Sequence, residues 1–175
     1  MELIDNELKL RPFEESDSKK LAELCNNRKI WDNLRDYIPF PYTVQNAEDF
    51  IKHCKNENPQ FTFAIEFNGE FVGSIGLVRQ TDVYKMTAEI GYWIGEPYWR
   101  MGITTRAVRL ISEYGFSKLG LARIFTGVFD FNKGSQKVLE KAGFKLECIF
   151  EKSILKNDKI SDEYRYGLIN KNATQ

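Results

Sequence analysis

The chain has 175 residues and no formal net charge, because 25 lysine and arginine residues balance 25 aspartate and glutamate residues. This balance leaves no large basic field that could hold nucleic acid or an anionic membrane surface. Hydrophobic residues make up 42% and charged residues 29% of the chain, which are ordinary fractions for a soluble globular protein. We therefore expect one domain over residues 1–175, large enough to bury a core of its own.

The cysteine and histidine residues of the chain argue against several kinds of functional site. Cys25, Cys54 and Cys148 stand singly, which argues against a disulfide framework or a metal knuckle and favours a reducing, cytoplasmic compartment. His53 is the only histidine, so imidazole triads and multi-histidine metal sites are nearly excluded, and we expect no metal and no role for His53. No apolar run reaches the length of a bilayer span and the N-terminus lacks a signal-peptide pattern, so no membrane partner is expected.

The first part of the chain predicts one short strand and two helices. Residues 8–11 indicate the strand. Ser16 or Asp17 is expected to cap the first helix, and Thr43 the second. The apolar sides of the two helices consist of Leu21, Leu24 and Cys25 in the first and of Ala47, Phe50, Ile51 and Cys54 in the second.

A β-hairpin is the clearest local signal in the sequence. Asn68-Gly69 forms a typical two-residue turn, and residues 71–78 return as the second strand. The first strand alternates large apolar residues with smaller or polar ones, and its apolar positions are Phe61, Phe63, Ile65 and Phe67.

The rest of the sequence predicts a strand–helix–strand crossover, then a short helix and two more strands. The crossover consists of a strand at 87–94, a helix at 104–116 and a strand at 123–130, so its two strands are expected to be parallel neighbours. Parallel neighbours that diverge at one end leave a cleft in which a ligand can lie. The final elements are a helix at 134–142 closed by Gly143, and strands at 145–155 and 160–169.

Together these elements predict an α+β fold with a mixed, largely antiparallel sheet of about seven strands flanked by about four helices. The turn between the strand at 87–94 and the helix after it is suited to bind a phosphate, because the first N–H groups of a helix lack partners and carry the positive end of its dipole. Gly102 lets the backbone approach such a ligand, and Arg100 adds a positive charge. Taken alone, this turn is equally consistent with an ordinary connection.

Four motifs occur in order along the chain: YIPFPYT at 37–43, AEIGYW at 88–93, YWRMGITTRA at 98–107, and NKGS at 132–135 followed by EKAGF at 140–144. In combination they resemble the GCN5-related N-acetyltransferase (GNAT) family, and within it the RimJ/RimL-like branch that acetylates the N-termini of ribosomal proteins. Gly102 matches the central glycine of the family's phosphate loop. Trp99 stands where Gln or Arg is usual, Thr104 replaces the final Gly or Ala, and Arg100 stands where this branch has glycine.

The resemblance implies a GNAT fold, in which a splayed pair of parallel strands holds acetyl-CoA, and transfer of an acetyl group to a primary amine without a metal. The backbone of the loop would bind the pyrophosphate, the end of the preceding strand would pair with the pantetheine arm, and Asn132 would cap a helix and bind pantetheine. The residues implied in cofactor binding are Tyr92, Trp93, Ile94, Arg100, Met101, Gly102, Ile103, Thr104, Thr105, Asn132 and Ser135.

Glu89 is the candidate catalytic base, because Ala88 and Ile90 point to the opposite face of the strand and leave its carboxylate facing the cleft. A modest base suffices for an α-amine, whose pKa of about 7.7–8.0 leaves it partly neutral at physiological pH. The resemblance assigns Ser135 to stabilising the departing thiolate, since Leu139 occupies the position where many family members have a tyrosine. A solvated strand residue for Glu89 and a plain helix residue for Ser135 are the alternatives.

The expected acceptor is the N-terminal α-amine of a protein, of the ribosomal-protein type. A small-amine acetyltransferase acting on a polyamine or an amino sugar is one alternative, and a non-catalytic regulator that binds acetyl-CoA is another. The family places its acceptor wall where this chain has Trp31, Asn33, Arg35 and Tyr37, although a structural loop also explains most of these residues. An exposed edge strand near the C-terminus would make a homodimer reasonable.

Overall fold

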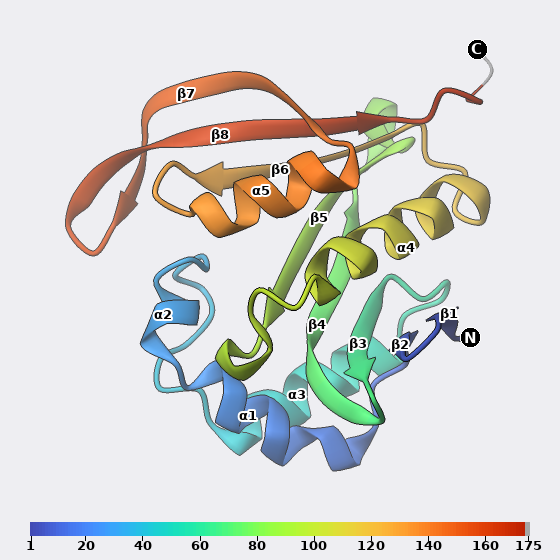
Figure 1. The fold of residues 1–175 in the computed structure, drawn as a ribbon, viewed down its shortest axis with the longest axis vertical. Coiled ribbons are helices and arrows are strands. Elements are labelled where there is room, and N and C mark those ends of the chain that lie inside the picture. Colours follow the sequence, from blue (N-terminus) through green and yellow to red (C-terminus); the bar gives the residue numbers. More distant parts are fainter. Residues whose placement is uncertain (174–175) are drawn as a thin grey trace. The chain divides into compact units, whose positions relative to one another are not determined.

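The computed structural model describes residues 1–173, which contain eight strands, five α-helices and three short 3-10 helices (Figure 1). In chain order they are β1 (Leu3–Asp5), β2 (Leu8–Arg11), η1 (Glu15–Asp17), α1 (Ser18–Cys25), α2 (Arg28–Trp31), α3 (Val44–Lys55), β3 (Thr62–Phe67), β4 (Glu70–Arg79), η2 (Asp82–Tyr84), β5 (Thr87–Ile94), η3 (Glu96–Tyr98), α4 (Ile103–Ser117), β6 (Arg123–Phe129), α5 (Lys133–Ala142), β7 (Lys145–Lys156) and β8 (Lys159–Ile169). The last two residues of the predicted domain lie outside this described range.

The strands form one sheet in the order β1-β2-β3-β4-β5-β6-β8-β7. The pairs β1–β2, β2–β3, β3–β4, β6–β8 and β7–β8 are antiparallel. β5 and β6 run parallel, with Thr87 opposite Arg123 and Glu89 opposite Phe125. The structure thus confirms the predicted α+β fold and the strand–helix–strand crossover between parallel neighbours.

Two compact units share the chain in alternating segments. Unit 1 comprises Met1–Gly76 and Tyr92–Ala107, and unit 2 comprises Leu77–Gly91 and Val108–Gln175. The strands β4 and β5 and the helix α4 each contribute residues to both units.

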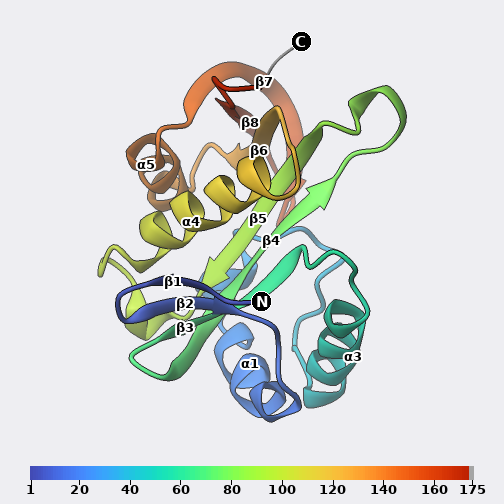
Figure 2. The ribbon, with the colours of Figure 1, turned by 90° about the vertical axis from the view of Figure 1, so that its right-hand side faces the viewer.

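In unit 1, α1 and α3 lie side by side (Figures 1 and 2). The hydroxyl oxygen of Thr43 accepts a hydrogen bond from the backbone N–H of Asn46 at 3.1 Å, which confirms the predicted cap of α3. Each fully buried large apolar side chain stabilises the fold by about 1.5–3 kcal/mol. The apolar cluster of this unit contains Phe13, Leu21, Ala22, Leu24, Cys25, Tyr42, Ala47, Ile51, Cys54, Ala64 and Phe71.

The hairpin of β3 and β4 turns at Asn68 and Gly69, as predicted. Both residues have positive φ, 52° and 81°, which is the conformation that a two-residue hairpin turn requires. Phe63 and Ile65, two of the alternating apolar residues, are fully buried at 0% exposure. The turn and the apolar alternation together fix the register of this hairpin.

The predicted cap of α1 is wrong. The helix begins at Ser18, and neither Ser16 nor Asp17 provides a side-chain cap, because η1 precedes the helix and Asp17 has another partner. Both carboxylate oxygens of Asp17 accept hydrogen bonds from the Arg11 guanidinium at 2.8 Å. The same carboxylate also accepts a hydrogen bond from the Glu14 N–H at 2.8 Å. The bidentate pair with Arg11 and this bond from Glu14 engage the Asp17 side chain, so it does not cap α1.

In unit 2, α5 lies along β6 and β8 (Figure 1), and the Tyr166 hydroxyl of β8 donates a hydrogen bond to the Glu140 carboxylate of α5 at 3.0 Å. Gly143 follows the helix in the left-handed conformation, with φ of 99°, and confirms the predicted C-terminal cap. The turn between β7 and β8 is formed by Asn157 and Asp158, whose φ angles are 51° and 59°.

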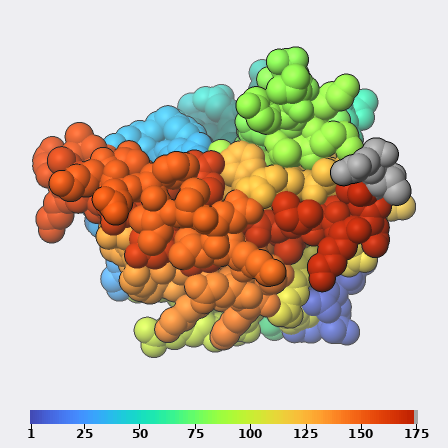
Figure 3. Space-filling view, turned by 90° about the horizontal axis from the view of Figure 1, so that it is seen from above, coloured from blue at the N-terminus to red at the C-terminus, as the bar shows by residue number. Residues whose placement is uncertain are grey.

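The strand β7 is the last in the sheet and is exposed along most of its length. Atoms of β7 and β8 form a surface of the molecule in the space-filling view, where they are orange and red (Figure 3). The predicted exposed edge strand is therefore present, while the homodimer stays a prediction. The large apolar side chains exposed on β7 are Leu146, Ile149, Phe150 and Leu155.

Five short elements were not predicted, namely β1, α2 and the three 3-10 helices. β1 has three residues and pairs with β2, and α2 has four residues and begins after Asn27, whose side chain accepts a hydrogen bond from the Lys29 backbone at 2.9 Å. A single turn of helix and a three-residue strand show too few repeats for an apolar period to be visible in the sequence. All the predicted elements are present, and their ends differ by a few residues from the prediction.

Candidate active site

In unit 1, the loop between β5 and α4 presents backbone N–H groups at the start of a helix. Arg100 and Gly102 both have left-handed backbone conformations, with φ of 66° and 79°. The first hydrogen bond of α4 joins the Arg106 N–H to the Gly102 carbonyl at 3.2 Å, so the N–H groups of residues 103–105 lie outside the helical ladder. A Cβ at Gly102 would meet nothing within 4 Å, which leaves open space beside the loop. This geometry fits an anionic ligand such as a pyrophosphate.

Trp99 attaches this loop to the end of β5. Its indole N–H donates a hydrogen bond to the carbonyl of Ile94 at 2.9 Å. Tyr92 and Trp93 of the same strand end are half-buried, and Ile94 is buried. The indole therefore has a structural role at the position where the family pattern has Gln or Arg.

Arg106 fastens the first turn of α4 to the hairpin of β1 and β2, a contact that sequence reasoning missed. Its guanidinium donates to the Asp5 carboxylate at 2.7 Å and to the Glu7 carboxylate at 2.6 Å. These hydrogen bonds hold the pKa of both carboxyls below their ordinary values. The contact could not be expected from the sequence, because β1 itself was not predicted.

The four predicted acceptor residues, Trp31, Asn33, Arg35 and Tyr37, lie at the end of α2 and in the turn that follows. The Trp31 indole donates to the carbonyl of Ile38 at 2.8 Å, which gives it a structural role. The Asn33 amide donates to a carbonyl of α2 at 2.8 Å, and its oxygen is buried with no hydrogen-bond partner among residues 1–173. Arg35 and Tyr37 are exposed. Their role in acceptor binding stays a prediction.

In unit 2, Glu89 lies where the pairing of β5 and β6 ends. Ala88 and Ile90 are buried at 0% and 1% exposure, while Glu89 is half-buried on the opposite face of the strand. Over the described residues, the paired stretch covers three residues of each strand and stops at Glu89 and Phe125. The expected alternation along β5 is thus confirmed, and the carboxylate projects from the last paired position.

The Asn132 and Ser135 motif forms the start of α5. The Asn132 side-chain oxygen accepts a hydrogen bond from the Ser135 N–H at 3.1 Å, which confirms Asn132 as the cap of this helix. Ser135 is half-buried in the first turn. Leu139, at the position where many family members have a tyrosine, is fully buried and belongs to the core. The structure brings Glu89, Asn132 and Ser135 into the same unit.

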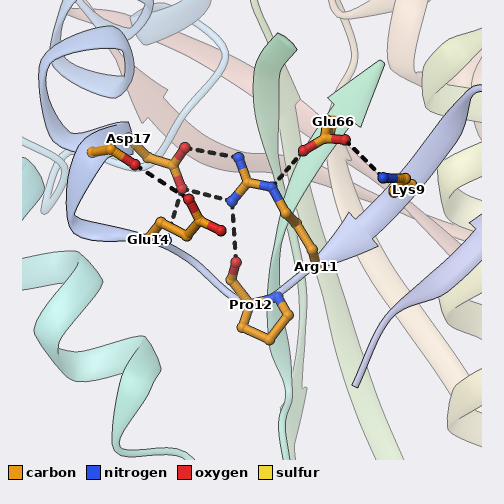
Figure 4. Close-up of polar contacts among 7 residues, drawn as sticks. Lys9, Arg11, Pro12, Glu14, Asp17 and Glu66 are labelled. Carbon is orange, nitrogen blue, oxygen red and sulfur yellow. Dashed lines mark hydrogen bonds and ion pairs between the residues drawn. The ribbon is translucent and has the colours of Figure 1, made fainter. Parts of the chain in front are cut away.

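Two surface hollows of unit 1 are lined by none of the predicted site residues. One, of about 470 Å³, is lined by residues of η1 and α3. The other, of about 420 Å³, lies beside a charged cluster around Arg11 (Figure 4). In this cluster Arg11 donates to Asp17 at 2.8 Å and to Glu66 at 2.7 Å, and Lys9 approaches Glu66 at 3.3 Å. The hydrogen bond from Arg11 lowers the pKa of Glu66. The positive and negative charges of this cluster are thus paired with one another.

Residues 1–173 contain no cluster of three or more His, Cys, Asp or Glu side chains suited to hold a metal ion. None of their helices is long and apolar enough to cross a membrane.

Known proteins resemble this chain over most of its length. A family model described as "Acetyltransferase (GNAT) domain" matches residues 7–145. The probable N-acetyltransferase YjcK of Bacillus subtilis (strain 168) is 31% identical, with 95% of this chain and 96% of that protein covered. Spermidine N(1)-acetyltransferase of Escherichia coli (strain K12) is 30% identical over 80% of this chain and 74% of that protein.

A further relative and a solved structure are also similar to this chain. The ribosomal-protein-serine acetyltransferase of Escherichia coli (strain K12) is 27% identical, with 95% of this chain and 94% of that protein covered. The microcin C7 self-immunity acetyltransferase MccE, solved in complex with acetyl-CoA and AMP, superposes with a TM-score of 0.80 at 25% identity. That match covers 95% of this chain and 94% of the solved one.

Proposed function

The chain belongs to the GNAT family of acetyltransferases and is an acetyl-CoA-dependent N-acetyltransferase, and on this premise we propose that it acetylates the N-terminal α-amine of a protein. The similarity to the ribosomal-protein-serine acetyltransferase over 95% of the chain supports this acceptor and the RimJ/RimL-like branch. This similarity is the observation that carries the choice of acceptor, and the position of Glu89 at the end of the paired stretch of β5 supports its part in the transfer.

The chain would hold the cofactor through backbone groups. The N–H groups of Arg100 to Thr105 bind the pyrophosphate, and the left-handed conformations of Arg100 and Gly102 are of the kind found in anion-binding loops. In unit 1, the end of β5 at Tyr92, Trp93 and Ile94 pairs with the pantetheine arm. Bound acetyl-CoA supplies the acetyl group as an activated thioester.

Glu89 acts as the general base in this proposal. Attack on the thioester requires a neutral amine, and an α-amino group with a pKa of about 7.7–8.0 loses its proton readily at physiological pH. A half-buried carboxylate, acting directly or through one water molecule, takes that proton as the carbon–nitrogen bond forms. Ser135, in the first turn of α5, donates a hydrogen bond to the departing thiolate.

Replacing Glu89 by glutamine tests this role. Because the amide cannot accept the proton, E89Q is expected to lower kcat by about 10²–10⁴-fold while the affinity for CoA stays unchanged. Release of free thiol from acetyl-CoA measures the rate, and calorimetry with CoA measures binding. An E89Q protein with the wild-type rate at every pH would remove Glu89 from the mechanism.

A small amine is the second candidate acceptor, favoured by the 30% identity to the spermidine N(1)-acetyltransferase. The two candidates differ in the amine that must lose its proton, because a primary alkylamine, like a lysine side chain, has a pKa near 10.4. Side-by-side thiol-release assays with N-terminal peptides, spermidine and an aminoglycoside separate them. A higher kcat/KM for spermidine than for every peptide would replace the first proposal by the second.

A further inference from the structure

Glu89 shares one face of the unit 2 sheet with an arginine of β8. Residues that pair across neighbouring strands point to the same face. The register pairs Glu89 with Phe125 on β6, and it pairs Gly127, two residues further along β6, with Arg165 on β8. Phe125, Gly127 and Arg165 therefore lie on the face from which the Glu89 carboxylate projects.

Arg165 is fixed on this face by two aromatic rings and a carboxylate. Its guanidinium carbon lies 5.3 Å from the centre of the Phe125 ring and 5.2 Å from that of Phe150. Its Nε and Nη2 atoms donate to one oxygen of Glu163 at 3.1 and 2.6 Å. Gly127 has no side chain beneath the Glu163 carboxylate, and a Cβ there would collide with it. These contacts hold the side chain in place although it is 31% exposed.

One edge of the Arg165 guanidinium remains available. Within residues 1–173, Nη1 of Arg165 has no hydrogen-bond partner, since its contacts use Nε and Nη2. Glu147, the other carboxylate near it, is engaged at both oxygens by Arg123. The hydrogen bonds from Arg123 are the main reason that the pKa of Glu147 is lowered, and the charge of Arg165 adds to this effect. Arg165 thus has a spare donor edge that is well suited to a carboxylate.

The position of this edge relative to Glu89 indicates what could bind there. Arg165 lies two strands away from Glu89 and two residues further along, opposite Gly127. With about 4.8 Å between strands and about 3.3 Å per residue, the backbones of Glu89 and Arg165 are separated by roughly 12 Å, a gap that the long arginine side chain can narrow. An extended peptide advances by about 3.3 Å per residue, so a peptide whose amine is at Glu89 places its third residue near Arg165. We propose that Arg165 determines specificity by binding a carboxylate on the third residue of a peptide acceptor. This inference rests on the proposed function.

Two peptide acceptors that differ in one group provide the test. The hexapeptide amides Ser-Ala-Asp-Ala-Ala-Gly and Ser-Ala-Asn-Ala-Ala-Gly have no other carboxylate, and thiol release from acetyl-CoA gives kcat and KM for each. We expect the Asp peptide to have a kcat/KM about 10- to 100-fold higher, mainly through KM, because a hydrogen bond between charged groups is replaced by a weaker one. In R165Q this preference disappears, while kcat for the Asn peptide is unchanged.

R123Q is the matched control, because it also breaks an arginine–glutamate pair on the same sheet. The Arg123 guanidinium already binds both carboxylate oxygens of Glu147 through its two terminal nitrogens. This variant is expected to keep the preference for the Asp peptide. R165K, which keeps the charge without the fork, is expected to retain part of the preference and guards against misfolding of R165Q. Equal use of both peptides by the wild-type protein would overturn the inference, whereas absence of thiol release with every amine would overturn the proposed function instead.

Discussion

Arg100 occupies a backbone conformation that glycine adopts far more readily than any other residue. Its φ of 66° lies in the left-handed region, which costs a residue with a Cβ about 1–2 kcal/mol. The ribosomal branch has glycine at this position, so the structure explains that pattern in physical terms. The loop keeps its shape here because Trp99 attaches it to the end of β5 and α4 begins directly after Gly102.

Relief of this strain can be measured with two variants. R100G and R100A both remove the guanidinium, but only glycine removes the cost of the left-handed conformation. We expect the free energy of unfolding of R100G to exceed that of R100A by about 1 kcal/mol in urea denaturation. Equal stabilities would mean that the loop is not held in the left-handed conformation in solution.

Ser135 is predicted to act on the leaving group. The cap of α5 uses the backbone N–H of Ser135 and the side chain of Asn132, so replacing the Ser135 hydroxyl leaves that cap intact. S135A is expected to lower kcat by about tenfold, the effect of losing one hydrogen bond to a charged group, with KM for acetyl-CoA little changed. S135T, which keeps a hydroxyl, is the control. A wild-type kcat for S135A in the thiol-release assay would limit Ser135 to a structural role.

At the scale of elements, the start of α3 is stabilised by two reciprocal hydrogen bonds between Thr43 and Asn46. The Thr43 hydroxyl oxygen accepts a hydrogen bond from the Asn46 N–H, and the Asn46 side-chain oxygen accepts one from the Thr43 N–H at 2.9 Å. T43A is expected to lower the free energy of unfolding by about 1 kcal/mol, because it leaves a backbone donor without a partner. T43S keeps the hydroxyl oxygen and is expected to stay close to the wild type in urea denaturation. Equal losses in T43A and T43S would assign the effect to the lost methyl group.

The elements that sequence analysis predicted correctly are those whose signals are local. The Asn68-Gly69 turn, the Thr43 cap, the Gly143 cap and the Asn132 cap each depend on residues within a few positions, and the structure contains all four. Alternation along β5 also predicted correctly which side chains face the core, since Ala88 and Ile90 are buried and Glu89 is not fully buried.

What the sequence could not predict depends on contacts between distant residues. The short helix α2 is held by hydrogen bonds from Asn27 and Lys29 to Glu96, which lies 69 and 67 residues further along the chain. The placement of Arg165 over Phe125 required the register of β6 and β8. These pairings leave no periodic pattern in the sequence. The sequence could therefore predict which residues belong to the candidate site, but not the side chains that surround them.

For the whole molecule, the charged cluster around Arg11 links stability to pH. The hydrogen bond from Arg11 lowers the pKa of Glu66 in the folded state below its ordinary value of 4.5. A carboxyl with a lowered pKa stabilises the fold at pH values above its unfolded pKa, and this contribution is lost as the pH falls through the folded pKa. The free energy of unfolding is therefore expected to decline as the pH falls below about 4.5.

E66Q isolates this contribution. Glutamine cannot ionise, so the decline of the free energy of unfolding between about pH 5 and pH 3 is expected to be shallower in E66Q than in the wild type. Urea denaturation at a series of pH values measures both slopes. E2Q, which alters an exposed carboxyl near the N-terminus, is the control and is expected to keep the wild-type slope. Identical slopes for E66Q and the wild type would contradict this linkage.

The alternation of the two units along the chain limits how the protein can be divided. Unit 1 closes only with residues 92–107, which follow the first segment of unit 2, so no single truncation releases either unit intact. During synthesis the ribosome has already extruded Leu77–Gly91 before the last part of unit 1 emerges. Gene fragments that stop at Gly76 or start at Val108 would each encode an incomplete core, so dissection by expression of halves is expected to yield insoluble material.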